Sequence, residues 1–172
     1  KNAHSCICKS LQMGVSTLMD FRAMNNPEIK NYSLQEIIKN SVNLAKVYSS
    51  ENVQIEIEKG NDVKILADEN KLSAVLINLI KNAIESIEKE GLIKISTEDC
   101  GENVKIKISN NGMPIPENIQ KLIFNDGFTT KKEGNGLGLK ICQKSMEEQY
   151  GKLQLLKSDE KSTVFELTVL KG

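Results

Sequence analysis

The sequence has no excess of charge of either sign. Its 172 residues include 23 Lys and Arg and 23 Asp and Glu, so the formal net charge is 0. Nucleic-acid-binding domains usually carry a basic excess, and we therefore expect no nucleic-acid partner. Long hydrophobic runs are also missing, because the longest apolar stretch, Ala74 to Ile80, is interrupted by Asn78. A membrane-spanning helix needs about 20 apolar residues, so no membrane contact is expected within this chain.

Histidine is scarce, and the cysteines are not paired in sequence. His4 is the single histidine, and the four cysteines, Cys6, Cys8, Cys100 and Cys142, include no Cys-x-x-Cys pair. This spacing does not fit the usual zinc sites. Reduced, packed thiols in a cytoplasmic protein are the simplest interpretation, with a redox or metal role as the alternative. The N-terminus has no apolar signal-peptide core, and the absence of an initial Met suggests a piece of a longer protein, whose membrane anchorage stays open.

Periodic patterns of apolar residues predict an α+β fold. Spacings of 3 and 4 predict helices, and strict alternation predicts strands. Ser33 and Asp68 are expected N-caps. Few helices and several antiparallel strand pairs favour a two-layer α/β sandwich, in which a mixed sheet is covered on one face by helices and preceded by an N-terminal helical segment. The expected helices lie near 1–25, 34–45, 69–89 and 137–150, and the expected strands near 53–57, 63–66, 93–95, 104–108, 152–157 and 162–170.

Glycines gather just before and within the start of the last predicted helix. Five of the 11 glycines fall between residues 112 and 138, and three belong to the string GNGLGL at 134–139. Glycines allow the backbone to approach a ligand closely, and the N–H groups of a helix start can hold a phosphate. The string alone is equally compatible with a flexible surface loop. A Rossmann-type site is excluded, because a polar loop rather than a strand precedes the glycines.

The helix predicted over 69–89 carries one polar stripe. Asn78, Asn82 and Glu85 are spaced i, i+4, i+7 and share a face, with Lys81 beside them. Asparagine is a weak helix former, so two of them one turn apart in an apolar helix are unusual. They are either border residues of the buried face or amide oxygens offered to a hard cation such as Mg²⁺, itself held by nucleotide phosphates.

Four short motifs occur in a fixed order: NLIKNA at 78–83, NNGMPIP at 110–116, Phe124, and GNGLGL at 134–139. Their order and spacing resemble the N, first-glycine, F and second-glycine boxes of the sensor histidine kinase ATP-binding domain. That domain belongs to the superfamily shared with DNA gyrase, MutL and the ninety-kilodalton heat-shock chaperones. The resemblance covers about residues 30–172 and implies a Bergerat-type fold with ATP and Mg²⁺ as cofactors. It divides the chain into the second helix of a dimerisation hairpin, 1–28, and a catalytic domain, 29–172.

The resemblance also implies roles for single residues. Asn82 matches the Mg²⁺-binding asparagine, and Asn78 stands where ATP-hydrolysing relatives have a glutamate that activates water. Both are the expected catalytic residues, and asparagine at 78 favours phosphoryl transfer over hydrolysis. Thr163 matches a threonine that helps bind adenine, and a mobile lid is expected over about 124–137. The complete set expected at the ATP site is Asn78, Lys81, Asn82, Glu85, Asn110, Gly112, Ile115, Phe124, Thr129, Thr130, Lys131, Gly134, Gly136, Leu137, Gly138, Leu139 and Thr163.

Some positions depart from the family pattern. The first glycine box normally begins with an aspartate that accepts a hydrogen bond from the adenine amino group, and here it begins with Asn110. A neutral amide oxygen can still accept that bond, at a cost of about 1 kcal/mol relative to a carboxylate. The second glycine of the box is Pro114, the third glycine box at 160–163 has no glycine, and a frequent basic position is Glu85. These changes leave ATP affinity to be measured.

The resemblance implies an enzyme: the ATP-binding catalytic part of a two-component sensor histidine kinase. It would transfer the ATP γ-phosphoryl group to a histidine, for relay to an aspartate of a response-regulator receiver domain. The N-terminal helices would form a homodimer. His4 lies only 17 residues before Phe21, so the phosphoacceptor is expected in a helix before Lys1. The alternative is a catalytically inactive, kinase-like dimeric scaffold. A serine kinase of the same fold and a gyrase-like ATPase are disfavoured by the N-terminal helix and by Asn78.

Overall fold

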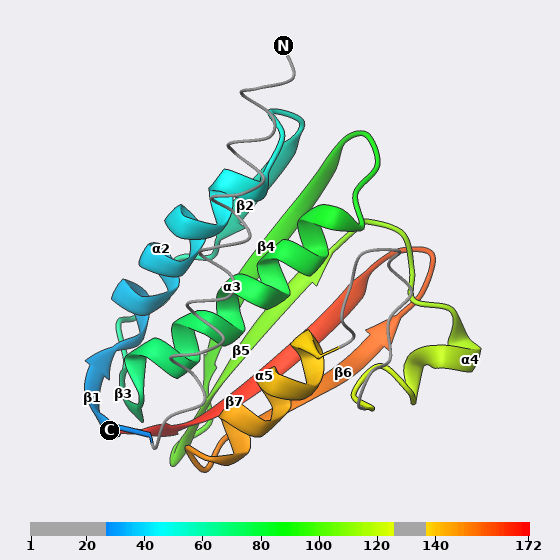
Figure 1. Cartoon of the computed structure of the whole chain (residues 1–172). Helices are drawn as coiled ribbons and strands as arrows, with labels where there is room; N and C mark the ends of the chain where they lie inside the picture. Colours follow the sequence, from blue (N-terminus) through cyan, green and yellow to red (C-terminus); the bar gives the residue numbers. More distant parts are fainter. Residues whose placement is uncertain (1–26, 126–136) are drawn as a thin grey trace, which may run out of the picture.

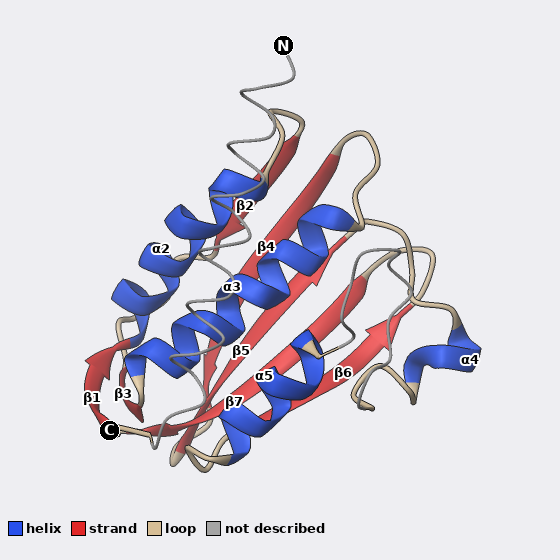
Figure 2. Cartoon of the chain, viewed as in Figure 1, coloured by secondary structure: helices blue, strands red, loops and turns tan. Residues whose placement is uncertain are grey.

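The computed structural model describes residues 27–125 and 137–172 of the chain. In these residues the chain forms a mixed seven-stranded sheet with α2, α3 and α5 lying over one face (Figures 1 and 2). The predicted α+β architecture, a sheet covered on one face by helices, is confirmed. The helix predicted over 1–25 lies outside the described residues, as does most of the predicted lid. No helix of the described residues has the length and apolar character needed to cross a bilayer.

The elements follow the order in which the sequence patterns predict them, with additions. The helices are α2 (Leu34–Ala45), the short 3-10 helix η1 (Lys46–Tyr48), α3 (Glu69–Glu85), α4 (Glu117–Gln120) and α5 (Gly138–Glu147). The strands are β1 (Lys30–Ser33), β2 (Val53–Ile57), β3 (Lys64–Ala67), β4 (Gly91–Asp99), β5 (Asn103–Asn110), β6 (Lys152–Ser158) and β7 (Thr163–Lys171).

The sheet has the strand order β1-β3-β7-β5-β4-β2, and β6 also pairs with β7. The β2–β4 pair is parallel and the other pairs are antiparallel. β5 lies along one edge of β7. The other edge is divided, because β6 pairs with residues 163–168 and β3 with residues 170–171. β7 therefore joins three strands that are far apart in the sequence.

Side-chain caps set the starts of the two long helices. Ser33 accepts a hydrogen bond from the Glu36 N–H at 3.2 Å, and Asp68 accepts one from the Lys71 N–H at 3.0 Å, so both predicted N-caps are confirmed. α3 ends at Glu85, short of the predicted 89. Ser86 explains the difference, because its hydroxyl bonds the Ala83 carbonyl oxygen and offers the backbone an alternative to another helical turn.

The core lies between the helices and the covered face of the sheet. In β5, alternate residues from Val104 to Asn110 are buried, which is the pattern of a strand with one covered face. The apolar side of α3 packs on these strands, with Leu72, Leu76 and Ile80 fully buried. The arrangement leaves the polar stripe of α3 at the border of the core, where it can meet α5 and the end of β5.

Candidate functional site

The polar stripe of α3 is partly buried, as border residues should be. Asn78, Lys81 and Asn82 are half-buried and Glu85 is exposed. The Lys81 ammonium group lies 4.8 Å from the ring centroid of Tyr48 and 4.0 Å from a Glu85 carboxylate oxygen. The predicted set on α3 therefore forms one continuous face, and its lysine is held by an aromatic ring as well as by a carboxylate.

α5 begins directly over this face. The Asn78 amide nitrogen donates a hydrogen bond to the Cys142 sulfur at 3.0 Å. A Cβ atom on Gly138 would lie 3.0 Å from the Asn78 amide nitrogen and 3.3 Å from its oxygen, so glycine permits a close approach of the two helices. Two motifs separated by about 60 positions, NLIKNA and the end of GNGLGL, thus meet in space.

The start of α5 can receive an anion. Its N-cap position is held by Leu137, whose apolar side chain cannot accept a hydrogen bond. The first intrahelical bond runs from the Ile141 N–H to the Leu137 carbonyl oxygen at 2.8 Å, so the N–H groups of residues 138–140 precede the helical ladder. Such groups, together with the helix dipole, bind phosphate and carboxylate groups.

Asn110 ends β5 close to the end of α3. Its side chain is buried, and the amide nitrogen donates a hydrogen bond to the Ser86 hydroxyl oxygen at 2.9 Å. The Met113 N–H donates to the Ser86 carbonyl oxygen at 2.8 Å. A Cβ on Gly112 would lie only 2.2 Å from the Ser86 hydroxyl oxygen, so the loop after β5 packs tightly on the helix end. Ser86 is therefore the point at which α3, β5 and this loop are joined.

The ends of β5, β7 and β6 place three polar side chains in a row. Asn110 pairs with Thr163 across β5–β7, and Thr163 pairs with Ser158 across β7–β6. The hydroxyl oxygens of Thr163 and Ser158 lie 2.6 Å apart. The Ile115 N–H donates to the Ser158 hydroxyl oxygen at 2.8 Å, so that hydroxyl can give its own proton to Thr163. The row presents hydrogen-bonding groups at one end of the sheet.

The loop that contains Ile115 is attached to β6. The Gln120 amide donates to the Ile115 carbonyl oxygen at 2.8 Å and to the Ser158 carbonyl oxygen at 3.0 Å. Phe124 packs edge-to-face on Phe165, with ring centroids 6.5 Å apart and planes at 89°. Phe124 is thus a packing residue that holds the chain just before residue 126 against the sheet.

The turn between β6 and β7, which lacks the glycine of the family pattern, is held by a carboxylate. An Asp159 side-chain oxygen accepts hydrogen bonds from the N–H groups of Lys161 and Ser162, each at 2.9 Å. The Ser162 and Lys161 N–H groups keep the pKa of Asp159 below its ordinary range. An aspartate side chain closes this turn, and it positions the start of β7 where Thr163 lies.

The structure brings most of the predicted residues to one region but not all of them. α3, the end of β5, the following loop, the start of β7 and the start of α5 contribute Asn78, Lys81, Asn82, Glu85, Asn110, Gly112, Ile115, Leu137, Gly138, Leu139 and Thr163. Phe124 supports this region from the core. Thr129, Thr130, Lys131, Gly134 and Gly136 lie outside the described residues. Ser86, Ser158 and Gln120 were missed by sequence reasoning, because their partners come from other elements.

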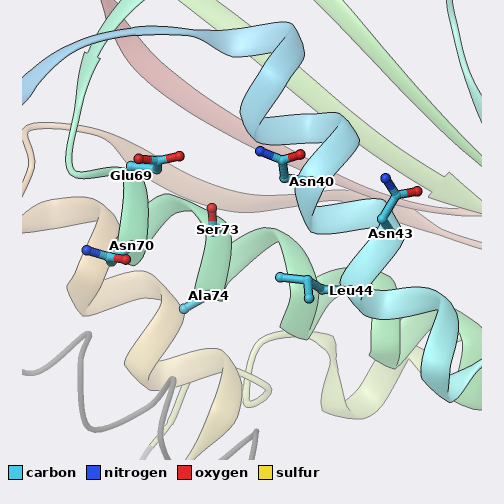
Figure 3. A pocket seen from close by; sticks show the side chains of 7 residues that line it. All are labelled: Asn40, Asn43, Leu44, Glu69, Asn70, Ser73 and Ala74. Carbon is cyan, nitrogen blue, oxygen red and sulfur yellow. The ribbon is translucent and has the colours of Figure 1, made fainter.

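A hollow beside the first part of α3 has none of these residues in its lining. It has a volume of about 500 Å³ and lies between α2 and α3 (Figure 3). Its lining is mostly amide and small side chains: Asn40, Asn43, Leu44, Glu69, Asn70, Ser73 and Ala74. Its lining includes the carboxylate of Glu69 and no basic side chain, so it carries no positive charge for a phosphate.

Comparison with known proteins tests the family assignment. Residues 67–172 match the family described as histidine kinase-, DNA gyrase B-, and HSP90-like ATPase. The chain belongs to this family. Among its relatives are sporulation kinase C of Bacillus subtilis, 29% identical over 94% of this chain, and the sensor histidine kinase ZraS of Escherichia coli, 30% identical over 94%. The domain is therefore of the sensor histidine kinase type, as the four motifs predicted.

Solved structures agree with this assignment. The catalytic domain of the histidine kinase ThkA, in a nucleotide-free form, is 35% identical, with a TM-score of 0.71 over 84% of this chain and 96% of that one. A complex of ThkA with the response regulator protein TrrA matches with a TM-score of 0.74 at 30% identity, over 98% of this chain and 49% of that one. The chain spans only 38% and 33% of the length of the two curated relatives.

Proposed function

We propose that this chain is the ATP-binding catalytic part of a sensor histidine kinase, whose site takes ATP with Mg²⁺. The observation that carries the proposal is the contact of Asn78 with Gly138. It places the amide groups of α3 beside the N–H groups that open α5, so ligands for a cation and for phosphates lie next to each other. The proposed site residues are those gathered by the fold, Phe124, and the five that lie outside the described residues.

The residues present fit the two ligands. Amide oxygens suit a hard cation, and Asn82 is half-buried one helical turn after Asn78, which contacts α5. Magnesium, when bound, would neutralise charge on the phosphates. Asn78 cannot remove a proton from water, because its amide is not a base. The site is therefore suited to passing a phosphoryl group to a histidine rather than to hydrolysis.

The base of the nucleotide is assigned to the ends of β5 and β7. Asn110 has an amide oxygen that can accept a hydrogen bond, and Thr163 has a hydroxyl proton to give when Ser158 donates to it. This division places the base near the sheet and the phosphates near α5.

The partners and the remaining organisation are part of the same proposal. We assign residues 29–172 to the catalytic domain and residues 1–28 to the second helix of a dimerisation hairpin, through which the full-length protein would form a homodimer. The phosphoryl group would pass on to a response-regulator receiver domain in the cytoplasm. A solved complex of the related histidine kinase ThkA with the response regulator TrrA supports this partner class.

Titration calorimetry with a non-hydrolysable ATP analogue, with and without Mg²⁺, tests the site. We expect the wild type to bind and Asn82→Ala to lose the Mg²⁺-dependent part of the affinity. Asn70→Ala is the matched control, because Asn70 is exposed on the same helix and lines the separate hollow. It should bind like the wild type.

The alternative function is a kinase-like scaffold without turnover. Asn110 in place of an aspartate and the missing glycine at 160–163 favour it. In that case the wild type and Asn82→Ala would both fail to bind at millimolar nucleotide. Equal binding by the wild type and Asn82→Ala at every Mg²⁺ concentration would contradict the assignment of Asn82.

A further inference from the structure

The orientation of the Asn110 amide is fixed by the hydrogen bonds of Ser86. The Ser86 hydroxyl has one proton, and it donates that proton to the Ala83 carbonyl oxygen at 2.7 Å. Towards Asn110 the same oxygen can therefore only accept, at 2.9 Å, and the group that faces it must be the amide nitrogen. The Asn110 oxygen is thereby turned away from the end of α3.

The reversed amide would cost one of these two bonds. With its oxygen towards Ser86, Asn110 could be bonded only if the hydroxyl released Ala83 and donated to the amide instead. Two hydrogen bonds would become one. Loss of a typical hydrogen bond shifts the equilibrium between the two orientations of the amide by about fivefold to tenfold. Where no hydrogen-bond partner distinguishes the oxygen of a side-chain amide from its nitrogen, neither orientation is favoured. Ser86 supplies that distinction here.

The backbone around Ser86 holds its hydroxyl in place. The Ser86 carbonyl oxygen accepts a hydrogen bond from the Met113 N–H at 2.8 Å, and Gly112 packs so closely that an added Cβ would lie 2.2 Å from the hydroxyl oxygen. Asn110 itself is 5% exposed, at the end of a strand paired on both sides. Neither partner of the bond can move far without disturbing the helix end or the sheet.

We propose that Ser86 is a positioning residue that sets base selectivity, by presenting the Asn110 side chain to the nucleotide as a hydrogen-bond acceptor. The proposal rests on the function proposed above. An acceptor pairs with the 6-amino group of adenine and opposes the 6-oxo group of hypoxanthine or guanine. An aspartate is an acceptor at both oxygens, so it needs no such partner. An asparagine can turn its amide nitrogen towards the base and donate a hydrogen bond. Base selectivity then depends on the group that holds the amide in one orientation.

Calorimetric titration of the chain with ADP and with inosine diphosphate (IDP) tests the proposal, since the two bases differ at position 6. The measured quantity is the ratio of the IDP Kd to the ADP Kd. We expect the wild type to prefer ADP. Ser86→Ala should lower the ratio about fivefold to tenfold, mainly because IDP binds more tightly once the amide can reverse. Ser86→Cys should move it in the same direction, since sulfur is a weak acceptor, and it provides a second variant should the alanine variant not fold.

Two controls separate this role from a general effect on the fold. Ser73→Ala makes the same chemical change within α3, at a residue that lines the separate hollow, and it should leave the ratio unchanged. In an Asn110→Asp background the ratio should be at least as large as in the wild type, and adding Ser86→Ala should change it less than twofold. A role in folding alone would lower the affinity for both nucleotides and leave the ratio where it was.

The outcomes distinguish the two proposals. An unchanged ratio in Ser86→Ala and Ser86→Cys, with ADP still bound, would overturn the role of Ser86 and leave the ATP site intact. An equal fall of the ratio in the Asn110→Asp background would also overturn it. Equal binding of ADP and IDP by the wild type would refute the selectivity but not the site. Failure of the wild type to bind either nucleotide would refute both.

Discussion

Replacement of Gly112 by alanine gives a direct test of the joint between α3 and β5. The added Cβ would lie 2.2 Å from the Ser86 hydroxyl oxygen and 2.7 Å from the Ser86 carbonyl oxygen. The hydroxyl cannot rotate away without losing its bonds to Ala83 and Asn110, and the carbonyl oxygen belongs to the helix end. The loop must therefore move off α3 and give up the Met113 N–H bond.

The expected loss of stability is the sum of the overpacking and the lost hydrogen bond. Overpacking of this kind costs about 1–3 kcal/mol, and the upper half applies because part of the obstacle is backbone. The lost hydrogen bond adds about 1 kcal/mol. For a chain of this size each kcal/mol lowers the Tm by about 2–4 °C, so Gly112→Ala should lower it by roughly 6–16 °C. Its affinity for ADP should fall as well, because Asn110 shifts with the loop.

Thermal unfolding followed by circular dichroism measures the first effect and calorimetry the second. Gly101→Ala is the control, because Gly101 has a φ of +89° and its Cβ would meet no atom within 4 Å. It lies in the β4–β5 turn, at the end of β5 opposite Asn110. Its alanine variant should lose about 1 kcal/mol of stability and bind ADP normally. A Gly112→Ala protein that unfolds at the wild-type temperature would refute the reasoning.

Two further predictions concern stability. Ser41 is fully buried in α2, and its hydroxyl oxygen is the one buried side-chain oxygen without a hydrogen-bond partner among the described residues. Ser41→Ala should therefore raise the free energy of unfolding in urea by about 1 kcal/mol, and a decrease would contradict the assignment. On the surface, the Lys171 ammonium group and the Gly101 N–H hold the pKa of Asp99 below its ordinary value of 3.8. Because the folded pKa is lowered, the contribution of Asp99 to stability is complete above the ordinary value and is lost as the pH falls through the folded one. Asp99→Asn should therefore be less stable than the wild type at neutral pH, and the difference should shrink as the pH falls below the ordinary value of 3.8. A difference that is unchanged in acid would exclude this cause.

Much of the fold could be predicted from the sequence, because most helices and strands have one buried face. The strands β2, β4 and β5 and the helices α2, α3 and α5 all carry the apolar spacing that their burial requires. β1 was missed, since Lys30–Ser33 has no apolar alternation and is a strand through its backbone pairing with β3. α4 is a single turn within a region expected to be loop. The strand order was out of reach, because it depends on pairings between distant parts of the chain.

Some residues of the candidate site could likewise be predicted from the sequence, and others could not. Asn78, Asn82 and Gly138 could be named in advance, because helical spacing and a glycine string are local patterns. Ser86 could not, since a serine after a helix is an ordinary feature and its partner Asn110 lies 24 positions away. Ser158 likewise gains its role only when β6 meets β7 and the loop after β5. What sequence reasoning lacked was the set of tertiary hydrogen bonds that orient the named residues.

The position of β7 between three partners has a consequence for how the molecule is made. Ile65 in β3 pairs with Lys171, and Val104 in β5 pairs with Val169. When synthesis has reached the end of β6, the β4–β5 hairpin and the long helices can already form. The edges of β3 and β5 that pair with β7 still have no partner strand. Contacts of such long sequence separation are the slow ones in folding, and open strand edges invite pairing with other chains. We therefore expect the sheet to be completed late in folding, and the chain to be most prone to aggregation before β7 pairs with β3 and β5.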